Sequence, residues 1–444
     1  MPPKDHFARP IFALHIPRTP LAYPLNTMPL FDSLFSKSPP PPTSSVPSVG
    51  AVGASVGAAV GAVTQRVKLP NLGKNLFRDV QAHQLYIIIG AASLSSLILL
   101  RSVAGSTSPR VPKPIPSPRE VLPPEVLRAS PYPPNALEGA RDIDTPYGSI
   151  RVYEWGPKEG KRVLLIHGMS TPSVALSDLA HKLVKKGCRV MVFDLFGRGY
   201  SSAPDPRVYR YDSALYISQI SMALQSSSIS WSPFVVVGYS LGGAIAADFA
   251  SYFPNLVRGL VLVAPGGLIR TNRIGWRSKF LYSPGSILPE FFVHGLVSRR
   301  LHYKPDLAST IEPDAQIVEP GVRFNGVNLS ESHGSVTEVL DWQLQHHKGF
   351  VPAFISSIRY APIHEQHHRW GVIKDNIDKK QGRLREVWFV LGELDSVVVA
   401  DEIMEDAKNV LGDENARFRL VKGVGHEVAT ERADEIVRVV TRVL

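Results

Sequence analysis

A serine flanked by glycines is the residue of this chain best suited to nucleophilic chemistry. The segment Gly238-Tyr239-Ser240-Leu241-Gly242 follows an apolar, β-branched run and precedes an alanine-rich helical pattern. A sharp turn from a strand into a helix would hold the serine hydroxyl above the edge of a sheet. Glycine is needed two positions before and after the serine, because a side chain there would collide with neighbouring backbone. The N–H of Leu241 would then face the developing charge of a substrate carbonyl.

A base and an acid are needed to activate this serine. A serine hydroxyl is a poor nucleophile unless a base takes its proton, and that base needs an orienting acid. Asp395 and His426 each come just after an apolar run that is typical of a buried strand. Ser240, Asp395 and His426 therefore form the candidate catalytic triad, in the chain order nucleophile, acid, base. Glu393 stays open as the alternative acid.

The loop after the first apolar strand should supply a second donor to the oxyanion. His167-Gly168-Met169 follows the apolar run 162–166. We assign the second donor to the backbone N–H of Met169, beside the N–H of Leu241. His167 is expected to shape this loop and not to act as a base.

A competing motif would place zinc in the chain. The segment His364-Glu365-Gln366-His367-His368 fits H-E-x-x-H, in which two histidines four apart on a helix bind zinc. Lys374 stands where a third ligand would fall, and Pro362 limits a helix here. We therefore interpret these residues as the surface of a cap, and we expect neither a metal nor an organic cofactor.

The elements that must position these residues are expected between residues 141 and 444. Strand and helix patterns alternate there, which argues for a mostly parallel sheet with helices on both faces. The predicted elements are a hairpin at 143–155, strands at 162–166, 189–193, 234–237, 257–263, 386–391 and 417–421, and helices at 173–186, 207–226, 335–347 and 428–443. The alternation stops for more than a hundred residues, which is too long for a loop. We therefore expect an inserted helical cap at about 268–384 that excludes water from an apolar pocket.

Together these motifs resemble the α/β-hydrolase superfamily, in the group that carries a single helical cap after the sixth strand. The resemblance covers about residues 141–444 and depends on the segments 165–169 and 194–201, the turn at Ser240, and the segments holding Asp395 and His426. It implies the α/β-hydrolase fold and a Ser-Asp-His hydrolase. Epoxide hydrolases and haloalkane dehalogenases of the superfamily carry aspartate in place of Ser240, so those chemistries are disfavoured.

The first 140 residues differ from the rest in composition. They hold 13 of the 49 Lys and Arg, 6 of the 39 Asp and Glu, and 23 of the 38 Pro, so their net charge of 13 − 6 = +7 is most of the +10 of the chain. We expect residues 1–83 to be disordered and residues 102–140 to form a semi-rigid, Pro-rich linker. No basic helix or aromatic-basic platform appears, which argues against nucleic-acid binding.

Residues 85–100 carry no charged side chain. A membrane-spanning helix needs ~20 apolar residues, so this run is at the short end of the range. Tyr86 would lie at the membrane interface, and the Arg101 side chain could reach it. We predict one transmembrane helix at residues 84–101, membrane lipids as partners, and a location in the mitochondrion or the endoplasmic reticulum. The single cysteine, Cys188, excludes an internal disulfide and is expected to be buried.

The sequence therefore predicts a membrane-anchored serine hydrolase that cleaves a carboxylic ester. An apolar, capped pocket beside a membrane favours a hydrophobic or lipid-like ester as the substrate. Three alternatives stay open: a serine hydrolase of amide, thioester or carbon–carbon bonds, an acyltransferase with the same triad, and a catalytically inactive, membrane-tethered binding protein.

Overall fold

The computed structural model describes residues 86–98, 112–284, 288–302, 324 and 334–444. The chain divides into two compact units, residues 1–107 and residues 108–444. The first unit contributes one described helix, at residues 86–98. The predicted disorder of residues 1–83 lies outside the described residues.

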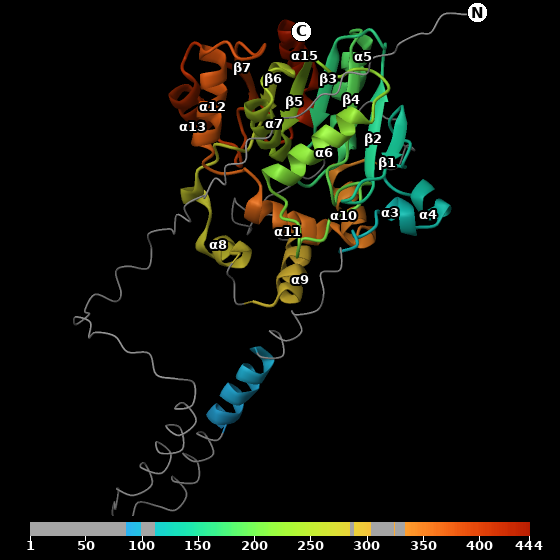
Figure 1. The fold of residues 1–444 in the computed structure, drawn as a ribbon, viewed down its shortest axis with the longest axis vertical. Coiled ribbons are helices and arrows are strands. Elements are labelled where there is room, and N and C mark those ends of the chain that lie inside the picture. Colours follow the sequence, from blue (N-terminus) through green and yellow to red (C-terminus); the bar gives the residue numbers. More distant parts are fainter. Residues whose placement is uncertain (1–85, 99–111, 285–287, 303–323, 325–333) are drawn as a thin grey trace, which may run out of the picture. The chain divides into compact units, whose positions relative to one another are not determined.

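An eight-stranded sheet forms the centre of residues 108–444 (Figure 1). Its strands are β1 Ala140–Ile143, β2 Ile150–Trp155, β3 Arg162–Ile166, β4 Arg189–Phe193, β5 Phe234–Tyr239, β6 Val257–Val263, β7 Val387–Gly392 and β8 Ala416–Val421, in the spatial order β1-β2-β4-β3-β5-β6-β7-β8. β2 pairs antiparallel with β1 and β4, and all other pairs are parallel. The predicted mostly parallel sheet is confirmed.

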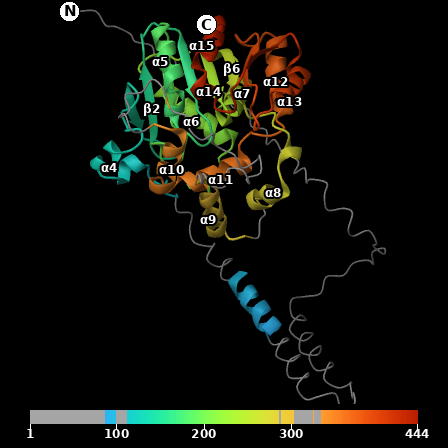
Figure 2. The same cartoon turned by 180° about the vertical axis from the view of Figure 1, so that it is seen from behind.

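The central strands are buried because helices cover both faces of the sheet. Val235 and Val236 in β5 are fully buried although their side chains point to opposite faces. The described helices of residues 108–444 are α3 Pro118–Val121, α4 Pro124–Arg128, α5 Ser177–Lys185, α6 Ser213–Gln225, α7 Leu241–Tyr252, α8 Trp276–Tyr282, α9 Glu290–Leu301, α10 Val336–His346, α11 Phe350–Tyr360, α12 His367–Asp378, α13 Ala400–Leu411, α14 Val428–Glu431 and α15 Ala433–Val443, with short 3-10 turns at Ser173–Leu176 and Thr271–Arg273. α5 and α15 pack together on one face, and α6, α7, α12 and α13 follow one another along the other (Figures 1 and 2).

Two predicted helices have different bounds in the structure. The helix expected from residue 207 begins at Ser213, because the Asp212 side chain accepts a hydrogen bond from the N–H of Leu215 at 3.2 Å and caps the helix there. Residues just before it form a turn in which Arg207 pairs with Asp205. The closing helix expected at 428–443 is interrupted at Arg432, which separates α14 from α15.

Four described helices, α8 to α11, lie between β6 and α12 and form a cap (Figure 1). The cap ends earlier than the expected residue 384, because α12 packs against α7 and α13. Trp370, Ile373 and Ile377 give α12 an apolar side that joins the main hydrophobic core. The helical layer on the sheet therefore includes α12, although the sequence pattern placed it in the cap.

Residues 112–140, which are most of the predicted linker, are part of the folded domain. This corrects the expectation that they form a semi-rigid linker. Ile115 and Ala203 exchange two backbone hydrogen bonds of 2.8 Å. The Glu120 carboxylate accepts a hydrogen bond from the Ser202 hydroxyl at 3.0 Å. Tyr132 is 2% exposed and packs in a second apolar cluster. These partners hold a Pro-rich segment against the domain, and composition alone does not reveal them.

The predicted membrane-spanning segment is described only at residues 86–98, where it is helical. Its expected ends, at residues 84–85 and 99–101, lie outside the described residues. Among the helices of the described ranges, none reaches the length and apolarity that crossing a bilayer requires.

Candidate active site

The turn between β5 and α7 holds Ser240 in a strained conformation. Its φ of 54° and ψ of −118° are unusual for a residue with a side chain. A Cβ added to Gly238 would lie 2.2 Å from the carbonyl oxygen of Gly242, and one added to Gly242 would lie 2.2 Å from that of Ile166. The two glycines are therefore required by close backbone approach, as the sequence predicts.

The structure brings the three candidate triad residues together. His426 follows β8, and its Nε2 lies 3.0 Å from the Ser240 Oγ. Its Nδ1 lies 2.8 Å from Oδ2 of Asp395, which follows β7. A ring that donates through Nδ1 to the carboxylate can accept the serine proton at Nε2. The geometry therefore suits transfer of a proton from Ser240 to His426.

Backbone amides fix the Asp395 carboxylate in this position. Its Oδ1 accepts hydrogen bonds from the N–H groups of Val397 and Val398, both at 2.8 Å. Its side chain is fully buried. The rival carboxylate, Glu393, is exposed and accepts a hydrogen bond from the N–H of Gly423 at 2.9 Å. Of the two carboxylates, Asp395 is the one that contacts the His426 ring.

A second acidic residue beside His426 was missed in the sequence analysis. Glu427 is 3% exposed, and its Oε2 accepts a hydrogen bond from the Tyr239 hydroxyl at 3.0 Å. The Tyr239 ring lies 5.5 Å from the His426 ring, centroid to centroid. This contact joins the loop after β8 to the end of β5, and so fixes the base beside the serine. In the sequence, the position of Glu427 directly after His426 was the one signal that could have identified it.

The loop after β3 packs directly on the serine. A Cβ added to Gly168 would lie 3.3 Å from the Ser240 Cβ. Met169 is the next residue along this loop. His167 is fully buried; its Nε2 accepts a hydrogen bond from the N–H of Leu195 at 2.8 Å, and its Nδ1 donates to the Gly168 carbonyl at 2.8 Å. Burial lowers the pKa of His167 to about 3, so its ring is neutral. The predicted structural role of His167 agrees with these contacts.

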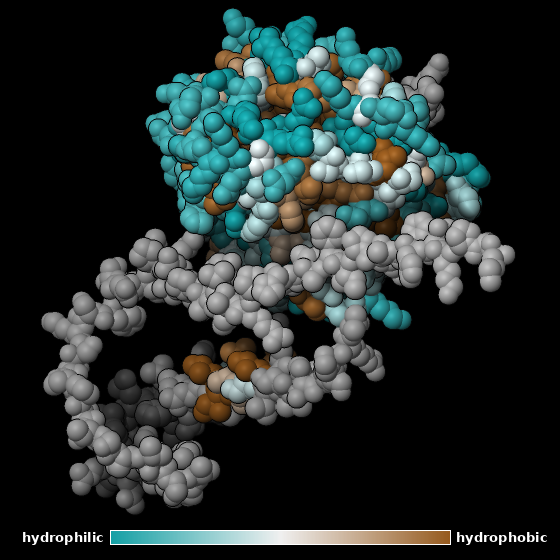
Figure 3. Space-filling view, turned by 45° about the horizontal axis from the view of Figure 1, so that its top comes forward, coloured by the Kyte–Doolittle hydropathy of each residue, from teal (hydrophilic) through white to brown (hydrophobic). Residues whose placement is uncertain are grey.

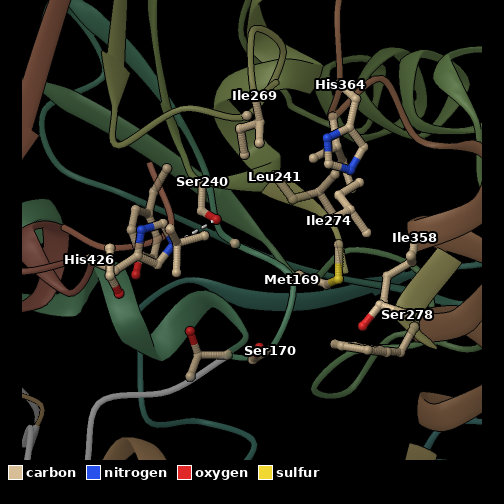
Figure 4. A pocket seen from close by; sticks show the side chains of 18 of the residues that line it. Met169, Ser170, Ser240, Leu241, Ile269, Ile274, Ser278, Ile358, His364 and His426 are labelled. Atoms are coloured by element: carbon tan, nitrogen blue, oxygen red, sulfur yellow. Dashed lines mark hydrogen bonds between the residues drawn. The ribbon is translucent and has the colours of Figure 1, made fainter. Parts of the chain in front are cut away.

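Leu241 begins the 12-residue helix α7. The first N–H groups of a helix have no partner inside it and carry a partial positive charge. The N–H of Leu241, directly after Ser240, therefore has no partner within α7. Met169 and Leu241 both line the same cavity as the serine (Figure 4).

The cavity above Ser240 has a volume of about 480 Å³. Both the loops at the sheet edge and the cap helices α8, α9 and α11 contribute to its wall (Figure 4). Its apolar lining consists of Met169, Leu241, Ile269, Ile274, Phe354, Ile358, Ile363 and Val397. A pocket of this size and apolarity accommodates a small hydrophobic molecule.

The H-E-x-x-H segment does not form one helix. α12 begins at His367, and Glu365 has a φ of 51° before it. The Glu365 carboxylate accepts hydrogen bonds from the N–H and hydroxyl of Thr271. His364 lines the cavity, whereas His368 is exposed, so the two rings do not share a helical face. The interpretation as cap surface residues is therefore wrong for His364, whose burial lowers its pKa.

Comparison with known proteins agrees with this architecture. Residues 161–307 match the family described as alpha/beta hydrolase fold. A serine hydrolase-like protein of Danio rerio is 30% identical over 131 residues, which are 29% of this chain and 39% of that protein. Its counterpart in Mus musculus is 29% identical over 127 residues, 29% of this chain and 40% of that protein. The aligned segment thus spans less than half of the length of these relatives.

Solved structures of low sequence identity also align with this chain. A carboxylesterase of the thaumarchaeon Nitrososphaera gargenis has a TM-score of 0.45 and 14% identity, over 68% of this chain and 100% of that chain. The family match over residues 161–307 includes β3, the turn at Ser240 and the start of the cap. With the sheet order and the flanking helices described above, this match shows that the chain has the α/β-hydrolase fold.

Proposed function

We propose that this chain is a serine hydrolase that cleaves a carboxylic ester of a hydrophobic or lipid-like substrate. The observation that carries the proposal is the continuous hydrogen-bonded path from Ser240 through His426 to Asp395, with distances of 3.0 and 2.8 Å. Ser240, at one end of this path, lines an apolar cavity of about 480 Å³. Such a site suits acyl transfer to a serine that lines the pocket.

The proposed reaction has two steps. His426 takes the Ser240 proton while Oγ attacks the ester carbonyl, and the N–H groups of Met169 and Leu241 stabilise the oxyanion. The carbonyl re-forms, the ester C–O bond breaks, and His426 gives its proton to the leaving alcohol. A water molecule then gives a proton to His426 and attacks the acyl-enzyme. The bond between the acyl carbon and Ser240 Oγ breaks, His426 returns the proton to Oγ, and the acid is released. Each oxyanion donor typically contributes ~3 kcal/mol to lowering the barrier.

We also propose that the chain works at a membrane, anchored by residues 84–101. The helix at residues 86–98 exposes Tyr86, Ile87 and Ile88 at 72, 70 and 64%, whereas the face of the catalytic unit in view is mainly hydrophilic (Figure 3). On the cap, Trp276 and Phe291 are 74 and 77% exposed. Exposed aromatic side chains of this kind favour a membrane interface. Mitochondrial or endoplasmic reticulum membranes are the proposed location.

Substrate profiling tests the ester proposal. We expect the full chain in detergent to hydrolyse para-nitrophenyl alkanoates and acylglycerols, and Ser240→Ala to lose activity by several orders of magnitude. Ser218→Ala, on the outer side of α6, is the matched control. Cleavage of amides, thioesters or diketones in preference to every ester would refute the proposed substrate class.

Vesicle binding and imaging test the membrane proposal. We expect the full chain to float with phospholipid vesicles, and a variant that lacks residues 84–101 to float less. A fluorescently tagged chain should mark mitochondria or the endoplasmic reticulum. A diffuse signal and no flotation would contradict membrane anchoring while leaving the ester hydrolase proposal intact.

A further inference from the structure

A polar cluster lies in the cap wall of the pocket. Arg300 on α9 lines the cavity and donates a hydrogen bond to the Ser278 hydroxyl on α8 at 3.4 Å. Tyr282, one helical turn after Ser278, lines the same cavity. In the close view, Ser278 lies across the pocket from Ser240 and His426, with Met169 and Ile274 between them (Figure 4). The pocket therefore has a nucleophilic end and a cationic end, separated by apolar side chains.

The charge of Arg300 is not balanced by a carboxylate among the described residues. Two other arginines of this region are paired with carboxylates: Arg359 bonds to Glu290 at 2.8 Å, and Arg270 bonds to Asp406 at 2.9 Å. The acidic residue of the pocket, Glu427, is engaged by the Tyr239 hydroxyl. Arg300 is half-buried, and a guanidinium in the wall of a pocket can bind a ligand that brings the missing negative charge.

The neighbours of Arg300 can also bind an anion. Burial raises the pKa of Tyr282, so its phenol remains protonated and can donate a hydrogen bond. Ser278 is 5% exposed and carries a hydroxyl that can also donate a hydrogen bond. A guanidinium with two hydroxyl donors suits the oxygen atoms of a carboxylate or a phosphate.

We propose that Arg300, Ser278 and Tyr282 form an anion subsite, and that the substrate is an ester carrying a carboxylate or phosphate group beyond an apolar spacer. The inference rests on the proposed ester hydrolase function, because Ser240 must act at the other end of the same molecule. It narrows the substrate to amphiphilic, negatively charged esters. Arg300 is thus a residue that determines specificity.

Matched pairs of esters test this subsite. The two esters of a pair have the same chain length, and only one of them ends in a carboxylate, as in para-nitrophenyl octanoate and para-nitrophenyl hydrogen suberate. The pairs form a series from short to long chains. A parallel series ends in phosphonate, and a third places the anionic group on the alcohol side. The measured quantity is the ratio of kcat/KM for the charged ester to that for its neutral partner. The phosphonate series distinguishes a phosphate subsite from a carboxylate subsite.

We expect Arg300→Gln to lower this ratio about tenfold to a hundredfold in at least one series, mainly through KM, and Arg300→Lys to lower it less. Arg299→Gln removes the same charge from the exposed neighbouring position and should leave the ratio unchanged. A ratio that Arg300→Gln leaves unchanged in every series would overturn the subsite. Labelling of each variant by a serine-directed phosphonate shows that its site is intact, and failure of the wild-type chain to label would refute the hydrolase proposal instead.

Discussion

Asp395 and Glu393 stand two positions apart, yet their carboxylates meet different surroundings. Asp395 is buried, contacts the His426 ring at 2.8 Å and accepts two backbone N–H groups. Glu393 is exposed and contacts a backbone amide of the next loop. A carboxylate that orients an imidazole must be held against one ring nitrogen, which only the first of these achieves.

Exchange of these two carboxylates for amides should therefore have unequal effects. We expect Asp395→Asn to reduce kcat for an ester by about 10³ to 10⁴, because an amide does not hold the imidazole in the required tautomer. Glu393→Gln makes the same chemical change two positions away and should alter kcat less than about threefold. Steady-state kinetics on one para-nitrophenyl ester measures both. Equal losses in the two variants would mean that Asp395 is not the orienting acid.

At the scale of the elements, sequence patterns located the strands well because each is a short apolar run with turn residues around it. The predicted bounds of β3, β4 and β6 are those of the structure. Helix ends were less predictable: the cap of α6 by Asp212 and the break at Arg432 depend on local backbone contacts. The placement of α12 on the sheet and of residues 112–140 on the domain depends on tertiary partners such as Trp370 and Tyr132, which no local pattern shows.

The candidate site was predictable to a similar degree. Ser240, Asp395 and His426 each follow a strand, so the common edge of a parallel sheet brings them together. The cap residues around the pocket, including Arg300 and His364, were not predictable because the cap has no repeating strand pattern to place them. Glu427 was overlooked because its role depends on Tyr239, 188 positions earlier in the chain.

The strand-to-helix turn gives a stability prediction at this scale. Gly238→Ala should strongly destabilise or unfold the domain, because its methyl group would lie 2.2 Å from the Gly242 carbonyl oxygen. Gly371→Ala on α12 has open space around the new methyl group and should stabilise by up to about 1 kcal/mol. Thermal unfolding followed by circular dichroism measures both. A Gly238→Ala domain with the wild-type melting temperature would contradict the described backbone packing.

At the scale of the whole molecule, two buried histidines connect separate parts of the unit at residues 108–444. His347, after α10, donates from Nε2 to the Ser201 carbonyl at 2.9 Å and accepts at Nδ1 from the N–H of Gly349 at 3.2 Å. Burial lowers its pKa from 6.5 to about 4, as it lowers that of His167 to about 3. Protonation of either ring would break the hydrogen bond that its unprotonated nitrogen accepts.

These shifts predict the pH dependence of stability. Below pH 6.5 the unfolded chain takes up a proton at each of the two histidines. The folded chain does so only near pH 4 at His347 and near pH 3 at His167. The free energy of unfolding therefore falls as the pH drops from 6.5 towards these values. At pH 5 the loss is about 2 kcal/mol per histidine. Urea unfolding of wild type and His347→Gln at pH 7 and pH 5 measures it. We expect the variant to lose less stability than wild type over this interval, and an equal or larger loss would contradict a buried neutral His347.

The central claim is that Ser240 is the nucleophile of this molecule, and a fluorophosphonate probe tests it most directly. After reaction of the full chain with the probe, digestion and mass spectrometry locate the adduct. We predict one adduct, on the peptide that contains Ser240, and its loss in Ser240→Ala and in His426→Ala with the fold retained. An adduct at another serine, or labelling that persists in both variants, would contradict the account.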